Sequence, residues 1–326
     1  MIRVGIVGYG NVGRGAEAAV LQSQDMVLSG IFTRRAPEDV HPLREDTPVF
    51  PVSLLLEQGA DVDVLLLCGG SATDLPVQTP ELARRYCVVD TFDTHARIPE
   101  HFANVDGAAK AGNTTAIIST GWDPGLFSLM RLLGTAILPE GTGDTFWGPG
   151  VSQGHSDAVR RIEGVADARQ YTIPVQKTMN AVRRGESGFT AREKHTREVY
   201  VVLKEGADPQ RVAQEIITMP NYFDEYDTTV HFILAEEMAS EHSAMPHGGF
   251  VIRSGKLGEA RQYGSLMEFK LELDSNPMFT GAIMTAFGRA CHRLHLQGRT
   301  GCFTVLDVPL GLLSPLDGEE LRSKLV

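Results

Sequence analysis

The chain begins with a short apolar run that leads directly into a glycine-rich turn. Residues 3–7 (Arg-Val-Gly-Ile-Val) have the composition of a buried strand, and a helical stretch begins at Val12. In dinucleotide-binding βαβ units the first glycine of such a turn permits the tight bend, the second lets the backbone approach a pyrophosphate, and the third lets helix and strand pack closely. The helix N-terminus then offers unpaired N–H groups to phosphates. The pattern predicts a dinucleotide site at Gly8, Tyr9, Gly10, Asn11, Val12 and Gly13; a glycine turn that serves packing alone is the alternative.

The residues after the second predicted strand indicate which dinucleotide is bound. Proteins that bind NAD place an acid about 20 residues beyond the glycines, where it accepts from the ribose 2′-hydroxyl. Here the strand from Val27 to Phe32 is followed by Thr33, Arg34 and Arg35. A hydroxyl and two guanidiniums suit a 2′-phosphate, so the sequence predicts NADP(H); solvated surface charges are the alternative.

Composition narrows the class of protein. The 326 residues suffice for one or two domains, and 42% hydrophobic with 22% charged residues is ordinary for a globular protein. A net charge of −11 argues against nucleic-acid and anionic membrane surfaces, and no apolar run is long enough to span a bilayer. Because the first strand starts at the N-terminus, we expect no signal peptide and a cytoplasmic protein. The four cysteines lack metal-ligand spacing, so we expect buried free thiols and no metal site.

The first 120 residues alternate strands and helices, as a doubly wound parallel sheet requires. Further strands are expected at 62–68, 86–89 and 115–119, and helices at 80–85 and 98–111. Ligands of such sheets bind beyond the carboxyl ends of the strands. The residues there complete the expected cofactor site: Cys68, Gly69, Gly70, Ser71, Ala72, Thr73, Asp90, Thr91, Phe92, Gly121, Trp122, Asp123, Pro124 and Gly125.

The pattern changes after about residue 120, where Asp123 and Pro124 are expected to cap a helix. Strand-like segments with few crossovers follow, at 168–173, 196–203, 228–234, 250–254 and 262–273. We therefore expect a Rossmann-type domain over 1–120 and an α+β, mostly antiparallel domain for substrate binding and dimerisation over 121–275. A long helix starting at residues 276–277 should present one apolar stripe and return the segment 276–326 to the first domain. The stripe comprises Phe279, Ile283, Phe287, Ala290 and Leu294.

Several polar clusters in the second half have two readings each. The segment 146–157 suits either a pocket-lining loop or the start of a capped helix after a Gly-Pro turn. His247 in a Pro-His-Gly-Gly turn is either structural or functional, and Asn276 either caps the last helix or binds a ligand. Arg197 is an outward-facing charge unless it meets an anion.

Longer motifs add a resemblance that covers essentially the whole chain. The sequence resembles the meso-diaminopimelate dehydrogenase family in residues 7–11, 31–36, 70–74, 119–125, 146–157, 245–249 and 286–290. The Trp-Gly-Pro-Gly and Gln-Gly-His-Ser-Asp stretches within 146–157 are more specific than the glycine turn. Two departures stand out: residues 42–47 lengthen a surface loop, expected to be without consequence, and Gly69 is a small residue that could widen the pocket.

The resemblance implies an NADP-dependent oxidoreductase acting on CH–NH2, and a homodimer. Its reaction would be the reversible oxidative deamination of the D-centre of meso-2,6-diaminopimelate to L-2-amino-6-oxopimelate and ammonia, in diaminopimelate and lysine biosynthesis. Asp90 and Asp123 would be catalytic, with the base left open between them. The implied substrate-binding residues are Asp90, Trp122, Asp123, Trp147, Gln153, Gly154, Thr172, Arg197, His247 and Asn276. Oxidation of another small polar or D-amino acid substrate, or a non-catalytic NADP-binding regulator, are the alternatives.

Overall fold

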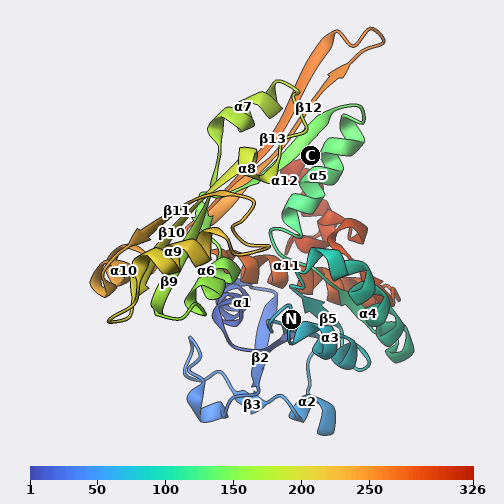
Figure 1. Ribbon diagram of the computed structural model, residues 1–326. Coiled ribbons are helices and arrows are strands. Elements are labelled where there is room, and N and C mark those ends of the chain that lie inside the picture. The colour runs from blue at the N-terminus through green and yellow to red at the C-terminus, as the bar shows by residue number, and fades with distance from the viewer. The chain divides into compact units, whose positions relative to one another are not determined.

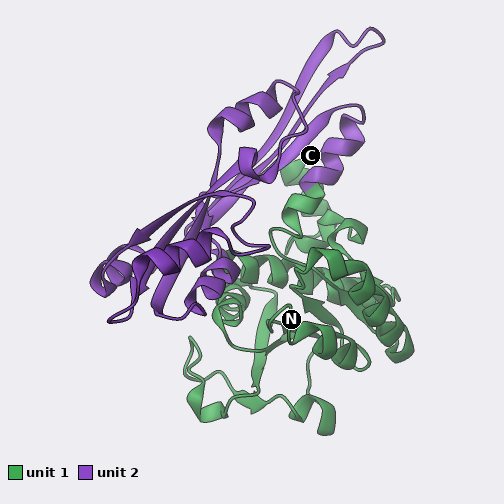
Figure 2. Ribbon diagram, viewed as in Figure 1, with its two compact units in different colours: residues 1–129, 277–326 green, residues 130–276 purple.

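The computed structural model describes residues 1–326, which form two compact units (Figures 1 and 2). Unit 1 comprises residues 1–129 and 277–326, and unit 2 comprises residues 130–276. The predicted fold class is confirmed, because unit 1 contains a parallel sheet with helices and unit 2 contains mostly antiparallel sheets. The first unit ends at Leu129 rather than at the predicted residue 120.

The sheet of unit 1 has seven parallel strands in the order β14-β6-β5-β4-β1-β2-β3. Two short edge strands, β3 and β14, were absent from the sequence prediction. Strand β4 is apolar throughout, and every residue of β4, β5 and β6 is buried, as expected of parallel strands that helices cover on both faces. The strand bounds are β1 (Ile2–Val7), β2 (Met26–Thr33), β3 (Val49–Pro51), β4 (Val64–Leu67), β5 (Val88–Asp90), β6 (Thr115–Ile117) and β14 (Gly301–Phe303).

The helices of unit 1 begin close to the expected positions, with one clear difference. Helix α3 begins at Leu75 rather than residue 80, so Pro80 lies inside it. Side chains of α3 and α4 join the sheet in one buried core that includes Leu75, Leu82 and Val105. The bounds are α1 (Asn11–Gln22), α2 (Leu54–Glu57), α3 (Leu75–Ala83), α4 (Ile98–Gly112), α11 (Asn276–Leu296) and α12 (Gly318–Leu325), with short 3-10 turns at 37–39, 95–97, 305–307 and 310–313.

Helix α11 is buried over more than the single stripe predicted from the sequence. Phe279 and Ile283 of that stripe are only half-buried, whereas Met284 and Gly288 are buried. The helix packs against α1 where Gly281 meets Gly15, and no side chain separates the two backbones. Small residues on α11 therefore replace part of the expected apolar stripe.

Unit 2 contains two sheets. The four-stranded sheet has the order β11-β10-β9-β8, with β10 and β11 parallel and the other pairs antiparallel. The three-stranded sheet, β13-β12-β7, is antiparallel and includes the long hairpin of β12 and β13 seen in Figure 1. The strands of the two sheets of unit 2 are β7 (Thr142–Trp147), β8 (Gly150–Val151), β9 (Val165–Pro174), β10 (His195–Leu203), β11 (Asp227–Phe232), β12 (His247–Leu257) and β13 (Tyr263–Leu273).

Helices α6 and α9 cover one face of the four-stranded sheet, where Val159, Val199 and Val212 share a buried core. The helices here are α6 (Gln153–Arg160), α7 (Gln176–Arg183), α8 (Ala191–Lys194), α9 (Pro209–Ile217) and α10 (Ala235–Glu241), while α5 (Leu126–Ile137) includes the boundary with unit 1. None of the chain's helices is both long and apolar enough to cross a membrane.

The contact between α1 and α11 predicts a sharp difference between two glycine-to-alanine substitutions. A Cβ on Gly281 would lie 2.2 Å from the carbonyl carbon of Gly15, so Gly281→Ala should lower the free energy of unfolding by about 1–3 kcal/mol. Gly107 is exposed within α4 with no atom near its Cβ position, so Gly107→Ala should raise it by about 0.5–1 kcal/mol. Urea unfolding measures both; equal effects would contradict the packing described.

Candidate active site

The glycine-rich turn of unit 1 has the geometry that a pyrophosphate site needs. Gly8 has a φ of +86°, which favours glycine, and a Cβ on Gly13 would lie 2.4 Å from the Gly8 carbonyl oxygen. A Cβ on Gly10 would meet no atom within 4 Å, so the backbone is open on that side. Helix α1 starts directly after Gly10 and directs its free N–H groups to the same place.

The two predicted arginines lie at the end of β2 but differ in their partners. Arg35 donates through Nη2 to the carbonyl oxygen of Tyr9, and its backbone N–H donates to Thr33 Oγ1 (3.1 Å). Arg34 is largely exposed and forms an ion pair with Asp74 (2.9 Å). Arg35 is thus tied to the glycine turn, while Arg34 is tied to the start of α3.

A buried carboxylate connects the glycine turn to the loop after β2. Glu17 on α1 is fully buried and accepts from the Tyr9 hydroxyl, the Leu43 N–H (2.9 Å), the Arg44 N–H (3.3 Å) and Thr47 Oγ1 (3.2 Å). Loop 42–47 is thereby linked through Glu17 to Tyr9, a residue of the predicted cofactor site. That the loop is without consequence for function stays a prediction.

The turn after β4 contains the predicted residues 68–73. The Asp74 carboxylate accepts from the Gly70 N–H (2.9 Å), and Ser71 Oγ accepts from the Asp93 N–H (2.8 Å). A Cβ on Gly69 would lie 2.9 Å from the Cβ of Asp74, so a side chain there would meet α3. The Cβ position of Gly69 thus points toward Asp74 and not into a cavity, which gives no support to the prediction that Gly69 widens a pocket. The Cys68 thiol is buried, which raises its pKa to about 12, and all four cysteines are free, as expected.

Asp90, at the end of β5, does not have the exposure expected of a residue that faces a substrate. Its side chain is fully buried, and its two carboxylate oxygens accept from two backbone N–H groups and pair with two side chains of the protein. An ionised carboxylate accepts about four hydrogen bonds, so its capacity is filled. This burial argues against direct contact between Asp90 and a substrate, and the predicted contact stays a prediction. Asp93 is the exposed carboxylate of the same loop.

Asp123 lies in the segment after β6 but does not cap a helix as predicted. Helix α5 begins at Leu126, and the Gly125 N–H donates to Ser128 Oγ (3.2 Å). The Asp123 side chain is half-buried, and Trp122 before it is buried edge-on against Phe127, with ring centroids 5.2 Å apart. Because it is only half-buried and follows the carboxyl end of β6, the Asp123 carboxylate is a candidate acid–base group.

In unit 2, β9 and β10 bring Arg197 and Thr172 together as direct cross-strand neighbours. The Arg197 side chain is buried, donates through Nη1 to Thr172 Oγ1, and lies over the ring of Tyr226 at 3.9 Å from its centroid. Its Nε has no hydrogen-bond partner, no carboxylate forms an ion pair with it, and burial lowers its pKa. A buried cation without an anion is costly, so this geometry suits a ligand carboxylate.

Three histidines near Arg197 are held neutral. Burial is the main cause, and the charge of Arg197 adds to it: the pKa of His155 falls to about 4, that of His195 to about 3, and that of His247 is lowered. The hydrogen bonds of two of them agree with the neutral form, in which one ring nitrogen is an acceptor. His195 Nε2 accepts from the Trp147 N–H (2.9 Å), and His247 Nδ1 accepts from the Gly248 N–H (2.8 Å). Arg197 is therefore the local positive charge near neutral pH.

The other predicted residues of unit 2 lie at the ends of its elements. Trp147 ends β7 and stacks on His195 with centroids 5.4 Å apart, and Gln153 and Gly154 form the first turn of α6. The Asn276 N–H, at the start of α11, donates to the Met245 carbonyl (3.0 Å), and Gln153 Nε2 contacts the sulfur of Met245 (2.8 Å). The segment 146–157 thus contains both a turn and the start of a helix. Ser152 Oγ forms a hydrogen bond with His155 Nδ1 and none with the backbone N–H groups at the start of α6.

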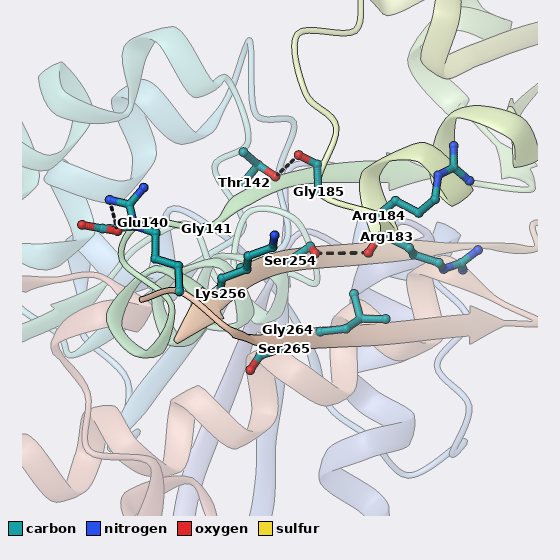
Figure 3. Close-up of a pocket in the computed structure, with 13 residues that line it drawn as sticks. Glu140, Gly141, Thr142, Arg183, Arg184, Gly185, Ser254, Lys256, Gly264 and Ser265 are labelled. Carbon is teal, nitrogen blue, oxygen red and sulfur yellow. Dashed lines mark hydrogen bonds and ion pairs between the residues drawn. The ribbon is translucent and has the colours of Figure 1, made fainter. Parts of the chain in front are cut away.

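A cavity of about 580 Å³ in unit 2 lies elsewhere, beside the turn end of the β12–β13 hairpin (Figure 3). Its three arginines already have acidic partners, since Arg183 pairs with Glu268, Arg184 with Glu186 and Arg261 with Glu140. None of the predicted site residues lines it.

Comparison with known proteins gives the family. The model of the diaminopimelic acid dehydrogenase C-terminal domain matches residues 121–275. The meso-diaminopimelate D-dehydrogenase of Ureibacillus thermosphaericus is 56% identical over 326 residues, covering 100% of this chain and 99% of the relative. The chain belongs to the meso-diaminopimelate D-dehydrogenase family.

Two solved structures of high similarity carry ligands. The Corynebacterium glutamicum DAP dehydrogenase in complex with DAP is 48% identical, with a TM-score of 0.92 over 100% of this chain and 99% of that chain. An engineered D-amino acid dehydrogenase bound to NADP+ is 46% identical, with a TM-score of 0.87 and the same coverage. The predicted family and NADP(H) as its cofactor are thereby confirmed.

The neutral histidines predict that acid destabilises the protein. A buried neutral histidine stabilises the folded state above its unfolded pKa of about 6.5, and this contribution is lost as the pH falls toward the folded pKa, about 3 for His195. Each such histidine adds a slope of up to about 1.4 kcal/mol per pH unit in that window. His195→Gln keeps an acceptor for the Trp147 N–H but does not titrate. Urea unfolding between pH 7.5 and 4 should show a shallower decline for the variant; parallel curves would refute this role.

Proposed function

We propose that this protein catalyses the NADP-dependent, reversible oxidative deamination of the D-centre of meso-2,6-diaminopimelate. The products are L-2-amino-6-oxopimelate, ammonia and NADPH. The observation that carries the proposal is the buried Arg197–Thr172 pair, a carboxylate site without an internal anion, in a family named for a dicarboxylate substrate. The substrate has two carboxylates and two ammonium groups, so it needs both cationic and anionic contacts.

The cofactor's parts match the residues of unit 1. The glycine turn and the N-terminus of α1 would bind the pyrophosphate, and Thr33, Arg34 and Arg35 the 2′-phosphate. The loops after β4, β5 and β6, including Gly70 and Gly121, would border the nicotinamide. NADP+ supplies the acceptor for the hydride that leaves the D α-carbon.

The acid–base work would fall to carboxylates of unit 1 that are not fully buried, Asp123 and Asp93. Asp123 would accept a proton from the D-ammonium group before hydride transfer. After releasing that proton to solvent, the same carboxylate would accept a proton from the water that adds to the imine carbon, and ammonia would then depart. The exposed Asp93 would attract the same ammonium group. Trp122 would give this region an apolar wall that limits access of water.

Unit 2 would hold the L-centre. Arg197 can form two parallel hydrogen bonds with a carboxylate, assisted by Thr172 and by neutral His247. Gln153, Gly154 and Asn276 would contact the remaining polar atoms, with Trp147 as an apolar wall. Because the L-end is fixed in this way, only the D-centre would present its hydrogen for transfer.

We also propose that the enzyme is a cytoplasmic homodimer, for which light scattering should give twice the mass of one chain.

The direct test is formation of NADPH from NADP+ and meso-diaminopimelate, followed at 340 nm, with the Asp123→Asn variant beside the parent. The variant keeps the shape of the side chain but cannot take a proton, so kcat should fall by about 10²-fold or more. Melting temperature and NADPH affinity should stay near parental. No activity in the parent would refute the function, whereas parental kcat in the variant would remove Asp123 as the base.

Stereochemical selection tests the assignment of unit 2. The L,L isomer should be inactive or inhibitory. Its second centre has the opposite configuration, so its α-hydrogen would not point toward the nicotinamide. Arg197→Lys should raise KM for meso-diaminopimelate by about tenfold or more, because an ammonium group cannot reproduce the bidentate contact. KM for NADP should be unchanged. Comparable turnover of both isomers would show that the two ends of the substrate are assigned wrongly.

A further inference from the structure

The carboxylate of Asp90 in unit 1 is buried and has four hydrogen-bond partners within the protein, and the proposed mechanism does not use it. Asp90 Oδ2 accepts from Thr79 Oγ1 (2.8 Å) on α3 and lies 2.7 Å from His101 Nε2 on α4. All three side chains are buried, and the His101 ring stacks on Phe92, with centroids 4.2 Å apart and 20° between the planes. The tautomer of His101 that satisfies an ionised carboxylate carries its proton on Nε2.

The other atoms of Asp90 reach two separate loops. Oδ1 accepts from the Phe92 N–H (3.1 Å) and from the Ser119 N–H (2.9 Å). The backbone carbonyl of Asp90 accepts from both the N–H (2.9 Å) and the hydroxyl (2.8 Å) of Thr120. One residue thus fastens the loop after β5, which carries Asp93, and the loop after β6, which carries Asp123.

Ser119 shows why this second loop needs fastening. Its φ of +59° lies in the left-handed region, which a non-glycine residue adopts only when its surroundings hold it there. The chain turns at this residue out of β6 toward Trp122 and Asp123. The bond from the Ser119 N–H to Asp90 Oδ1 is made at the turn itself.

We propose that Asp90 is a positioning residue, clamped by Thr79 and His101, whose carboxylate sets the loops that carry Asp93 and Asp123. This inference rests on the proposed dehydrogenase function. It assigns Asp90 no proton transfer, because every acceptor position of its carboxylate is occupied within the protein. It also gives His101, which contacts the loop after β5 through the Phe92 ring, an effect on the loop after β6 through Asp90.

The test compares substitutions that keep or remove the acceptor. Asp90→Asn keeps Oδ1 for the Ser119 and Phe92 N–H groups, and its amide can donate to Thr79 Oγ1 and to the other tautomer of His101. We expect kcat within about fivefold of the parent and an unchanged pH profile. Asp90→Ala should lower kcat by about 10²-fold, since small misplacements of catalytic groups have effects of this size. The deuterium isotope effect on kcat, measured with substrate deuterated at the D α-carbon, should be larger in Asp90→Ala than in the parent. KM for NADP should stay near the parental value.

His101 supplies a second pair of variants if Asp90→Ala does not fold. His101→Gln places a donor near the position of Nε2 and should restore most of the kcat that His101→Ala loses. Equal kcat in these two variants would overturn the proposal. A drop of about 10²-fold in Asp90→Asn, with loss of one limb of the pH profile, would overturn it too and make Asp90 an acid–base group.

Amide hydrogen exchange separates this inference from the proposed function. Exchange at Ser119 and Thr120 should speed up in His101→Ala or Asp90→Ala and remain slow in the Gln and Asn variants, whatever reaction the enzyme catalyses. Unchanged exchange in the alanine variants would show that Asp90 does not hold the loop. Inactivity of the parent with meso-diaminopimelate would refute the function alone.

Discussion

The arrangement of unit 1 depends on one constraint: all seven strands of its sheet run in the same direction. Their carboxyl ends consequently meet at a single edge, and each loop that leaves this edge can contribute to one site. The glycine turn, the arginines after β2, and the segments with Asp93 and Asp123 are all such loops. Buried carboxylates then fix the loops to one another: Glu17 links the glycine turn to the loop after β2, and Asp90 links the loops that contain Asp93 and Asp123.

Unit 2 solves a different electrostatic problem. A dicarboxylate must be recognised by a charge that does not already have an internal partner. Arg197 is kept buried by its contacts with Thr172 and Tyr226, and nearby histidines resist protonation because of burial and its charge. The positive charge is therefore single and fixed in place, which favours one orientation of an anionic ligand.

The sequence predicted the glycine turn, the sheet and the two arginines because these follow from local patterns. Local patterns carry no information on burial, on which the role of a side chain depends. Asp90 and Asp93 stand three residues apart in one loop, and only the structure shows that the first is enclosed and the second exposed. Asp123 beside Pro124 has the composition of a helix cap, yet the helix starts at Leu126. Tyr226 beneath Arg197 comes from a distant turn, a contact that no local pattern carries.

The order of the strands in unit 1 has a consequence for synthesis of the chain. Strand β6 ends at Ile117, but its outer neighbour β14 is not made until Gly301–Phe303, after the whole of unit 2. On the ribosome, the β6 edge therefore stays open while more than half of the chain emerges. Unpaired strand edges are where partly folded chains associate wrongly. For this protein the risk of such association lasts from the synthesis of β6 until β14 pairs with it.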